Sequence, residues 1–449
     1  MASKDKRAKI EALTRDLVLP NDTLKKVSNI LLHNFNCGLK GDTTINGTLK
    51  MLITYVRDVP NGSEQGKFLA LDLGGTNFRV LLIELEKDSF MMDNEIYAIP
   101  EYIMLGSGTQ LFDHIADCLN KFIKSRSLPN NLPLGFTFSF PCKQEGLTKA
   151  KLITWTKGFK CTGVENEDVV QLLRDAMGRK NVHIDVVAVV NDTTGTLMSC
   201  AHKNPKCRAG IIVGTGTNAC YMERLENVKL WDGGSDEPKQ VIINTEWGAF
   251  GDNGCLEFIR TKYDREVDAA SLNPGVQLFE KMISGMYMGE IARRVFIDAI
   301  NQKLLFDGKT TTKMNTPYAF KSKYISMIES DPKNSYLQTK QVLEKMNILG
   351  AREEDFECMK LICARISVRA AHLVSAGIAT ILDRMQRPHT TVGVDGSVYR
   401  YHPHFQRLME EKVAELTNPE YKFDLMLSED GSGRGAALVA AVAVRTEKK

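Results

Sequence analysis

Two strand-turn-strand segments, each with the letters Gly-Thr-Asn in its turn, organise this sequence. The first has short apolar runs on both sides of residues 73–77, and the second has them on both sides of residues 214–218. Apolar runs this short, interrupted by glycine, are typical of strands rather than helices. Because one pattern occurs in both halves, the sequence predicts two similar lobes.

Strands and helices alternate around these segments. Short apolar runs at 134–140 and 186–190 predict strands, and amphipathic spacing at 111–124 and 166–178 predicts helices between them. Such alternation is typical of α/β proteins whose sheet is largely parallel. The expected fold class is therefore α/β.

The ends of the chain have mainly helical periodicity. Residues up to about 60 are expected to be helical, and so is most of the chain after residue 255. The helices expected there span 275–303, 317–329, 338–347, 353–385 and 403–415. Two strand-like runs, 391–394 and 423–427, interrupt this region, and residues 437–444 predict a closing buried helix.

Composition excludes several classes of function. The chain has 449 residues, 43% of them hydrophobic, with 58 basic against 55 acidic residues. This length favours two or more lobes, and the charge balance gives no clustered basic face, so no nucleic-acid partner is expected. The apolar stretch nearest to membrane length, 361–385, contains Arg365, Arg369 and His372, so no membrane span is expected either.

The cysteines and the N-terminus indicate a compartment. The ten cysteines form no Cys-x-x-Cys pair and no zinc-like spacing with the eight histidines. The first residues are charged and lack the apolar core of a secretory signal. We therefore expect reduced thiols in a cytoplasmic protein.

The turn after the first strand has the composition of a phosphate-binding loop. Its glycines let backbone N–H groups approach a phosphate closely, Thr76 and Asn77 add donors, and Arg79 adds positive charge. Asp72, at the end of the strand, could hold a hydrated Mg²⁺. The alternative is a hairpin turn whose glycines only satisfy a positive φ.

Two common nucleotide motifs do not fit. Residues 214–219 read G-x-G-x-x-A, but the dinucleotide fingerprint requires a helix to begin there, and the following residues look like a strand. A P-loop ending in Gly308-Lys309-Thr310 would need a glycine at position 303, where Lys303 stands. Neither a nicotinamide or flavin site nor a P-loop is expected.

Asp192 follows a strand that is apolar on both faces. Such a run predicts a central strand, and ligands in open α/β sheets gather at the carboxyl ends of these strands. A carboxylate there could accept a proton from an attacking hydroxyl, which contributes about 10²–10⁴ in rate. An Asx turn or a helix cap would explain Asn191, Asp192 and Thr193 equally well.

Other polar residues stand in comparable places. Ser139 ends an apolar strand, and Lys157 could stabilise charge on a transferring phosphoryl group, unless it is a solvated surface lysine. Glu246 and Glu280 could accept hydrogen bonds from the hydroxyls of a sugar, although an exposed charge pair would also explain Glu280. Ser432 precedes the last helix, whose N-terminal N–H groups could bind an anion or simply be capped.

Taken together, these segments resemble the hexokinase family, in the same order and over essentially the whole chain. The segments that carry the resemblance are residues 71–79 (LDLGGTNFR), 138–141 (FSFP), 155–159 (WTKGF), 190–193 (VNDT), 214–216 (GTG), 246–251 (EWGAFG), 287–290 (YMGE), 393–397 (GVDGS) and 431–435 (GSGRG). One such match could be chance, but a series in order is not.

The resemblance implies a two-lobed, actin-like ATPase fold of the ribonuclease H type, with the active site in the cleft between the lobes. An N-terminal helical segment of the large lobe would span residues 1–62, the small lobe 63–192 and the large lobe 193–431. A C-terminal helix, 432–449, would return to the small lobe.

The resemblance also assigns residues to ligands. The sugar contacts of the family fall on Ser139, Thr156, Lys157, Asn191, Asp192, Asn218, Glu246 and Glu280. Its nucleotide contacts fall on Asp72, Gly74, Gly75, Thr76, Asn77, Arg79, Gly214, Thr215, Gly396, Ser397 and Ser432. Asp192 and Lys157 would be catalytic, and Mg²⁺ would arrive with ATP and reach Asp72 through water.

The implied reaction is the first step of glycolysis, in which the γ-phosphoryl of MgATP moves to the 6-hydroxyl of glucose or a related hexose. Asp192 would accept the hydroxyl proton. Met286 stands where glucokinase-type members have a lysine, which favours an ordinary low-KM hexokinase. Feedback by glucose 6-phosphate would use Thr76, Ser397 and Ser432, residues of the nucleotide set.

The family also contains fused chains of twice this length and members that dock on mitochondria, but the single copy and charged start predict neither, and a monomer is expected. Two other functions stay open. Against an actin-like or chaperone-like machine stand Glu246, Glu280 and Asp192, which such a machine does not need. Against a sugar sensor without catalysis stand Asp72, Asp192 and Lys157.

Overall fold

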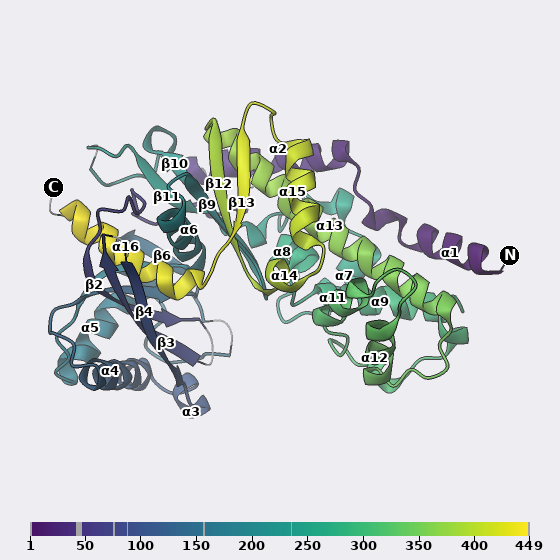
Figure 1. Ribbon diagram of the computed structural model, residues 1–449, viewed down its shortest axis with the longest axis horizontal. Coiled ribbons are helices and arrows are strands. Elements are labelled where there is room, and N and C mark those ends of the chain that lie inside the picture. Colours follow the sequence, from purple (N-terminus) through teal and green to yellow (C-terminus); the bar gives the residue numbers. More distant parts are fainter. Residues whose placement is uncertain are drawn as a thin grey trace.

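The computed structural model describes residues 2–41, 47–74, 77–87, 89–155, 158–234 and 236–447. Two sheets form the centres of two lobes that lie side by side (Figure 1), and a third sheet consists of a single two-stranded hairpin. The expectation of two lobes with α/β sheets is confirmed.

The small lobe contains the first glycine-rich turn. Its strands, in spatial order, are β4 (Ser89–Ala98), β3 (Asn77–Glu86), β2 (Gly66–Leu73), β5 (Pro133–Phe138) and β8 (Asp185–Val190). β4, β3 and β2 are antiparallel neighbours, whereas β2, β5 and β8 are parallel. The carboxyl ends of these three strands therefore lie at one edge.

The parallel strands β2, β5 and β8 are buried on both faces. Leu71 and Phe136 face α4 (Gly108–Ser125) and α5 (Val169–Arg179), whereas Ala70 and Ala188 face α6 (Asp192–Lys203) and α16 (Gly431–Glu447). This explains why the strands are apolar at successive positions instead of alternating with polar residues. The short helix α3 (Glu101–Met104) and the hairpin of β6 (Cys142–Gly146) and β7 (Lys149–Leu152) complete the lobe.

The large lobe contains the second glycine-rich turn. Its strands, in spatial order, are β1 (Leu52–Ile53), β11 (Gln240–Asn244), β10 (Thr217–Arg224), β9 (Cys207–Val213), β12 (His389–Asp395) and β13 (Lys422–Leu427). β9, β10 and β11 form an antiparallel meander, and β12 and β13 run parallel to β9. The turn between β9 and β10 thus leads from strand to strand, as expected.

Helices build the rest of the large lobe. They are α1 (Ala2–Leu13), α2 (Asn21–Lys40), α7 (Lys262–Ala269), α8 (Leu278–Ile283), α9 (Met288–Asn301), α10 (Thr312–Asn315), α11 (Ser322–Ser330), α12 (Leu337–Lys345), α13 (Glu353–Met385), α14 (Ser397–Tyr401) and α15 (Phe405–Leu416). Single 3-10 turns are η1 (Arg15–Leu17), η2 (Leu225–Asn227), η3 (Trp247–Ala249), η4 (Glu257–Ile259) and η5 (Phe306–Gly308).

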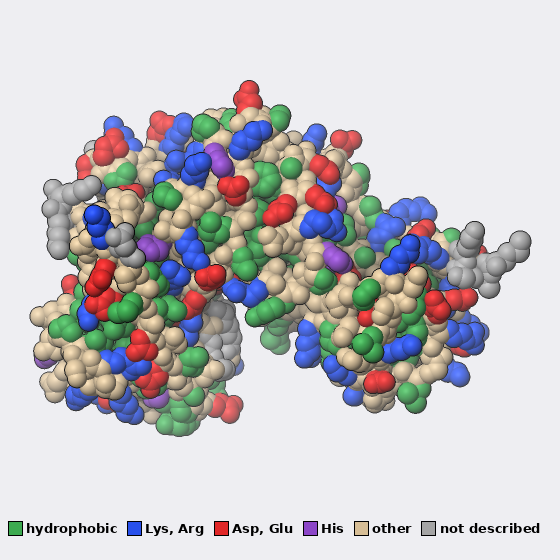
Figure 2. Space-filling view, in the orientation of Figure 1, with side chains coloured by type: hydrophobic (Ala, Val, Ile, Leu, Met, Phe, Trp, Pro, Cys, Tyr) green, Lys and Arg blue, Asp and Glu red, His purple; other side chains and the backbone are tan. Residues whose placement is uncertain are grey.

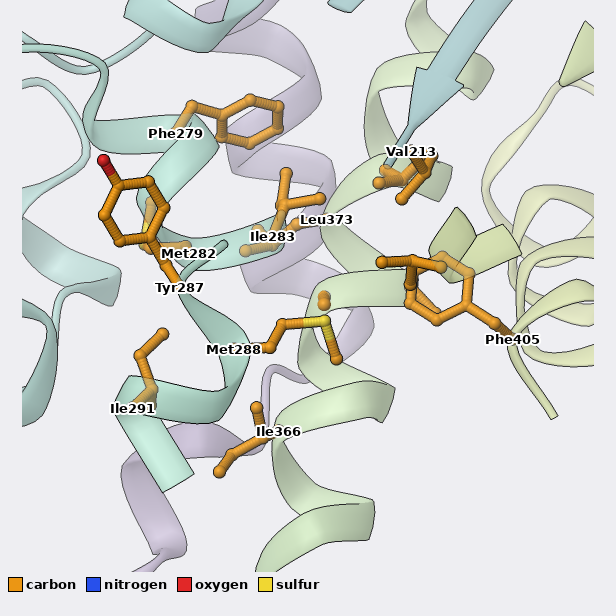
Figure 3. Close-up of a cluster of buried hydrophobic side chains, with 14 of the residues drawn as sticks. Val213, Phe279, Met282, Ile283, Tyr287, Met288, Ile291, Ile366, Leu373 and Phe405 are labelled. Atoms are coloured by element: carbon orange, nitrogen blue, oxygen red, sulfur yellow. The ribbon is translucent and has the colours of Figure 1, made fainter. Parts of the chain in front are cut away.

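The core of the large lobe lies between α8, α9, α13 and α15. Figure 3 shows Phe279 and Ile283 from α8 packed beside Leu373 of α13, with Phe405 of α15 nearby. By length and composition α13 could cross a membrane, but 72% of its most apolar window is buried inside the molecule, as in the core helix of a globular protein. Because α8 and α9 are packed into this core, the loops that lead into them are held in place.

Two expectations about helices are wrong. The N-terminal helical segment does not continue to residue 60: α2 ends at Lys40, where Gly41 adopts a left-handed φ of 65° and caps it. The expected helix 275–303 is divided into α8 and α9, because the N–H groups of Gly285 and Met286 bond to the turn after β9 instead of continuing the helix.

Candidate active site

The carboxyl ends of β2, β5 and β8 open on a cavity of about 390 Å³. Its lining consists of Asp72, Gly74, Asn77, Arg79, Ile96, Ser139, Asp192 and Ser432. In Figure 2 the molecule is deeply hollowed between the two lobes, at the lower edge of the view. Apart from Ile96, every lining residue is one that the sequence analysis assigned to the sugar or the nucleotide.

Arg79 is bound to acidic groups in this cavity. Its Nη2 donates to Asp430 Oδ1 at 2.6 Å and to Asp72 Oδ2 at 2.8 Å, and Ser432 Oγ donates to the same Asp72 oxygen at 2.8 Å. Burial alone would lower the pKa of the Arg79 guanidinium, but the hydrogen bonds and charges of Asp430 and Asp72 raise it. The ends of β2, β3 and α16 are therefore linked electrostatically.

Asp192 and its neighbour Asn191 have different surroundings. Asn191 caps α6, because its Oδ1 accepts from the backbone N–H of Thr194 at 3.1 Å, and its Nδ2 donates to Thr193 Oγ1 at 2.8 Å. Asp192 lies in the first turn of the helix and lines the cavity. The helix-cap interpretation is thus correct for Asn191, while Asp192 is placed where a ligand could meet it.

Three polar side chains form one hydrogen-bonded group on the large-lobe side. Asn218 Nδ2 donates to Asn244 Oδ1 at 2.9 Å and to Glu246 Oε1 at 3.2 Å, and Asn244 Nδ2 donates to Glu246 Oε1 at 2.8 Å. Burial raises the pKa of the Glu246 carboxyl, the two amides oppose that shift, and the charge of Asp192 adds to it. The charge of Asp192 thus makes ionisation of Glu246 less favourable.

Glu280 lies on α8, and its carboxylate is beside the turn between β9 and β10. Its Oε2 accepts from the backbone N–H of Thr217 at 3.0 Å, which fixes the carboxylate beside the start of β10. The neighbouring side chains Phe279 and Met282 are buried in the core of Figure 3, so the helix holds the carboxylate in place. Glu246 and Glu280 are thus both held by hydrogen bonds in the large lobe, Glu246 at the end of β11 and Glu280 at the start of β10.

A second cavity, of about 840 Å³, adjoins the turn after β9. Thr215 and Ser397 belong to its wall, and Gly396 next to Ser397 has a φ of 113°, where a Cβ would lie 2.4 Å from the carbonyl of Val213. Only glycine permits this contact between the two loops. The remaining wall consists of Gly285, Met286, Met288, Tyr318, Phe320, Lys321, Ser322, Lys323, Ser326, Met327, Ser330, Val398, Tyr401 and His402.

Four of the predicted site residues, Gly75, Thr76, Thr156 and Lys157, lie outside the described residues. Within the described ranges, no group of three or more His, Cys, Asp or Glu side chains could hold a metal ion. Asp72 lines the cavity beside the first turn, so its carboxylate suits a hydrated Mg²⁺ that a nucleotide brings with it.

Sequence reasoning missed two residues of this region. Asp430, with a left-handed φ of 56°, binds Arg79, and Asn244 binds both Asn218 and Glu246. Asp430 could have been found from its position directly before the glycine-rich start of α16. Nothing in the sequence distinguishes Asn244, because it ends an otherwise ordinary short strand.

The two sheets, the crossing helices and the cleft between the lobes define a two-lobed, actin-like ATPase fold. Hexokinase from Schistosoma mansoni, solved in complex with glucose, has the same architecture, with a TM-score of 0.90 and 41% sequence identity over 98% of this chain and 100% of that one. The expected fold class is confirmed.

Sequence comparison gives the family. Models described as hexokinase match residues 9–202 and 208–442. Mouse hexokinase HKDC1 is 48% identical over 98% of this chain and 48% of that protein, and human hexokinase-1 is 48% identical over 98% of this chain and 49% of that protein. This chain belongs to the hexokinase family. It spans about half the length of these curated relatives.

Proposed function

We propose that this chain is an ATP-dependent hexose 6-kinase, which transfers the γ-phosphoryl of MgATP to the 6-hydroxyl of glucose and related hexoses. The observation that carries the proposal is that Asp192 shares one cavity with Asp72, Arg79 and Ser432. An acid that can accept a hydroxyl proton thus faces the groups suited to phosphate and magnesium. Membership of the hexokinase family supports a sugar as the acceptor.

The hexose would lie between the lobes. Ser139 and Asp192 would contact it from the small-lobe side, and Asn218, Glu246 and Glu280 from the large lobe. As the 6-oxygen forms its bond to the γ-phosphorus, the bond from that phosphorus to ADP breaks and the hydroxyl proton passes to Asp192. Carboxylates and amides in fixed positions supply the acceptors that sugar hydroxyls need.

The nucleotide would run from the first cavity to the second. Gly74, Asn77 and Ser432 would face the terminal phosphates, and Thr215 and Ser397 would lie on the path to the cavity of about 840 Å³, whose mainly apolar wall suits the adenosine. Mg²⁺ bound to the triphosphate would neutralise its charge, and Asp72 would hold the ion through water.

The decisive experiment measures ADP formation from MgATP with and without glucose. Strong dependence on glucose, with glucose 6-phosphate formed in equal amount, supports the kinase. Turnover without glucose would instead indicate an ATP-driven machine, and binding of glucose without turnover would indicate a sensor. A panel of glucose, mannose, fructose and glucosamine then ranks the substrates.

The proposal also covers product inhibition, the oligomeric state and the cellular compartment. Glucose 6-phosphate would inhibit, because its phosphate would compete for the nucleotide positions near Ser397 and Ser432; initial rates at millimolar product test this. Light scattering tests the expected monomer. A reducing, cytoplasmic setting is supported by ten free cysteines, most of them buried.

A further inference from the structure

Asn244 lies in the large-lobe sheet, two residues before Glu246. It is the last residue of β11, it pairs with Cys220 of β10 and Leu52 of β1, and its side chain is buried. A buried amide without partners would be costly, and this one is bonded to Asn218 and to Glu246 at 2.9 and 2.8 Å. Its amide oxygen and its amide nitrogen are therefore each bonded to a residue of the proposed sugar site.

The hydrogen bonds among Asn218, Asn244 and Glu246 all lead, from donor to acceptor, toward the carboxylate of Glu246. The backbone N–H of Ala219 donates to Asn218 Oδ1 at 2.8 Å, so the Nδ2 of Asn218 must point toward Asn244 and Glu246. Because Asn244 accepts that bond through Oδ1, its own Nδ2 must point to Glu246. The residue at position 244 must therefore accept a hydrogen bond from Asn218 and donate one to Glu246, which an amide side chain can do.

Glu246 depends on this arrangement for its orientation. Its backbone is left-handed, with a φ of 52° and a ψ of 43°, a conformation that is unfavourable for a residue with a side chain and is typical of functional sites. Both amides converge on Oε1, so Oε2 is the oxygen expected to accept from a hexose hydroxyl. Burial raises the pKa of this carboxyl, and the bond from Asn244 opposes the shift.

We propose that Asn244 is a positioning residue for hexose binding: it orients Asn218 and Glu246 through hydrogen bonds, without touching the sugar itself. The inference rests on the proposed function, because it assigns Glu246 to the hexose. It predicts an effect on the KM for glucose and on its pH dependence, with little effect on the KM for ATP.

The test compares Asn244→Ala and Asn244→Asp with the wild-type chain. Loss of a hydrogen bond to a charged group should raise the KM for glucose by about 10-fold or more in Asn244→Ala, with the KM for ATP within about twofold. In Asn244→Asp the new carboxyl group cannot donate when ionised but can when protonated. Its KM for glucose should therefore fall as the pH is lowered from 8 to 6, whereas that of the wild type should stay flat or rise.

Asn227 provides a matched control. Its Nδ2 donates to a carboxylate of the same sheet, Glu223 Oε1, at 2.8 Å, but away from the cleft. Asn227→Ala and Asn227→Asp should leave the KM for glucose and its pH profile unchanged. Thermal unfolding identifies variants that fail to fold; if Asn244→Ala is one, the nearly isosteric Asn244→Asp decides the question through its pH profile.

The outcomes separate the two proposals. If the wild type turns over with glucose and the Asn244 variants keep its KM and pH profile, the positioning role is overturned and the kinase stands. The same holds if the KM values for glucose and ATP rise equally, since that pattern indicates general damage. If the wild type neither turns over nor binds glucose by calorimetry, the proposed function is overturned and this inference with it.

Discussion

Individual carboxylates in the cleft have contrasting partners. Asp72 is paired with the cation Arg79, Glu246 is held by the neutral amides of Asn218 and Asn244, and Asp192 lies in the first turn of a helix. Different surroundings give chemically identical groups different tasks, because they favour or oppose ionisation to different extents. We therefore expect magnesium binding, hydrogen-bond acceptance and proton transfer to fall on separate acids.

Asp192→Ala should fold normally and bind glucose, with kcat lower by about 10²–10⁴ because the proton acceptor is lost. Steady-state kinetics and calorimetry measure both quantities. Asp168→Ala is the control: Asp168 caps α5, accepting from Val170 N–H at 3.1 Å, so its loss should cost about 0.5–2 kcal/mol of stability with kcat unchanged. Near-normal turnover in Asp192→Ala would refute the assignment of the base.

Glucose affinity should fall as the pH is lowered through the ionisation of Glu246. Burial raises the pKa of this carboxyl above its usual range, so the acceptor is lost at a higher pH than for an exposed glutamate. The contribution of the same group to folding has the opposite sign: stability gains as the pH falls through the raised pKa, since the folded state binds the proton more tightly. Calorimetric titrations from pH 5 to 8 test the binding, and Glu246→Gln should abolish its pH dependence.

For single residues, the sequence could identify candidates for the site but could not tell which role each of them has. The sequence left Asp192 open to a catalytic or a capping role, and Asn191 to a sugar contact or a cap. In the structure Asn191 is the cap, and Asp192 lines the cavity. Asp430 and Asn244 entered the site through contacts with residues far away along the chain, Arg79 and Asn218. Such contacts form only in the folded state, so no local sequence pattern predicts them.

Among the elements, α6 and α16 cross at very short distance between the two sheets. A Cβ added to Gly435 of α16 would lie 2.1 Å from the carbonyl oxygen of Gly195 in α6. The helices could not accommodate it without moving apart, and the displacement would reach Asp192 and Ser432, which lie on the same two helices.

Gly435→Ala should therefore destabilise the chain by about 1–3 kcal/mol, the usual cost of overpacking a core. Gly178→Ala is the matched control, since a Cβ at this position of α5 would meet nothing within 4 Å. It should stabilise by about 0.4–1 kcal/mol through the lower entropy of the unfolded chain. Urea denaturation measures both; equal effects of the two substitutions would show that the helix crossing tolerates a side chain.

Most strands were predictable from an apolar run, but the buried strand β11 and the exposed edge strand β4 were both missed. The apolar runs of β2, β3, β5 and β8 identified these four strands, whereas β4 is an edge strand whose side chains are mostly exposed and lack a helical or strand period. The division of α8 from α9 was also hidden, because their apolar spacing continues across the break while the backbone N–H groups of Gly285 and Met286 bond to the turn after β9.

Considered as a whole, the molecule divides the proposed sugar site between its lobes. Ser139 and Asp192 are supplied at the small-lobe edge of the cleft, and Glu246 and Glu280 by the large lobe. A hexose that bonds to both groups would draw the lobes together, and closure would exclude the water that competes as a phosphoryl acceptor.

Saturating glucose should therefore reduce the radius of gyration measured by small-angle X-ray scattering. Asp192→Ala should show the same reduction, because it loses the proton acceptor and keeps the other hexose contacts, which separates closure from chemistry. An unchanged radius in a preparation whose ADP formation depends on glucose would contradict closure.

The position of α16 in the chain also affects how the protein folds during synthesis. Its apolar residues, Ala436 to Ala443, cover a face of β2 and β8, strands that are translated far earlier. Until residues 431–447 emerge from the ribosome, α6 is the one helix of the pair α6 and α16 that can cover that face, and part of the apolar face stays exposed. A truncation that removes α16 should therefore destabilise the small lobe, whose strands lie far before it in the chain.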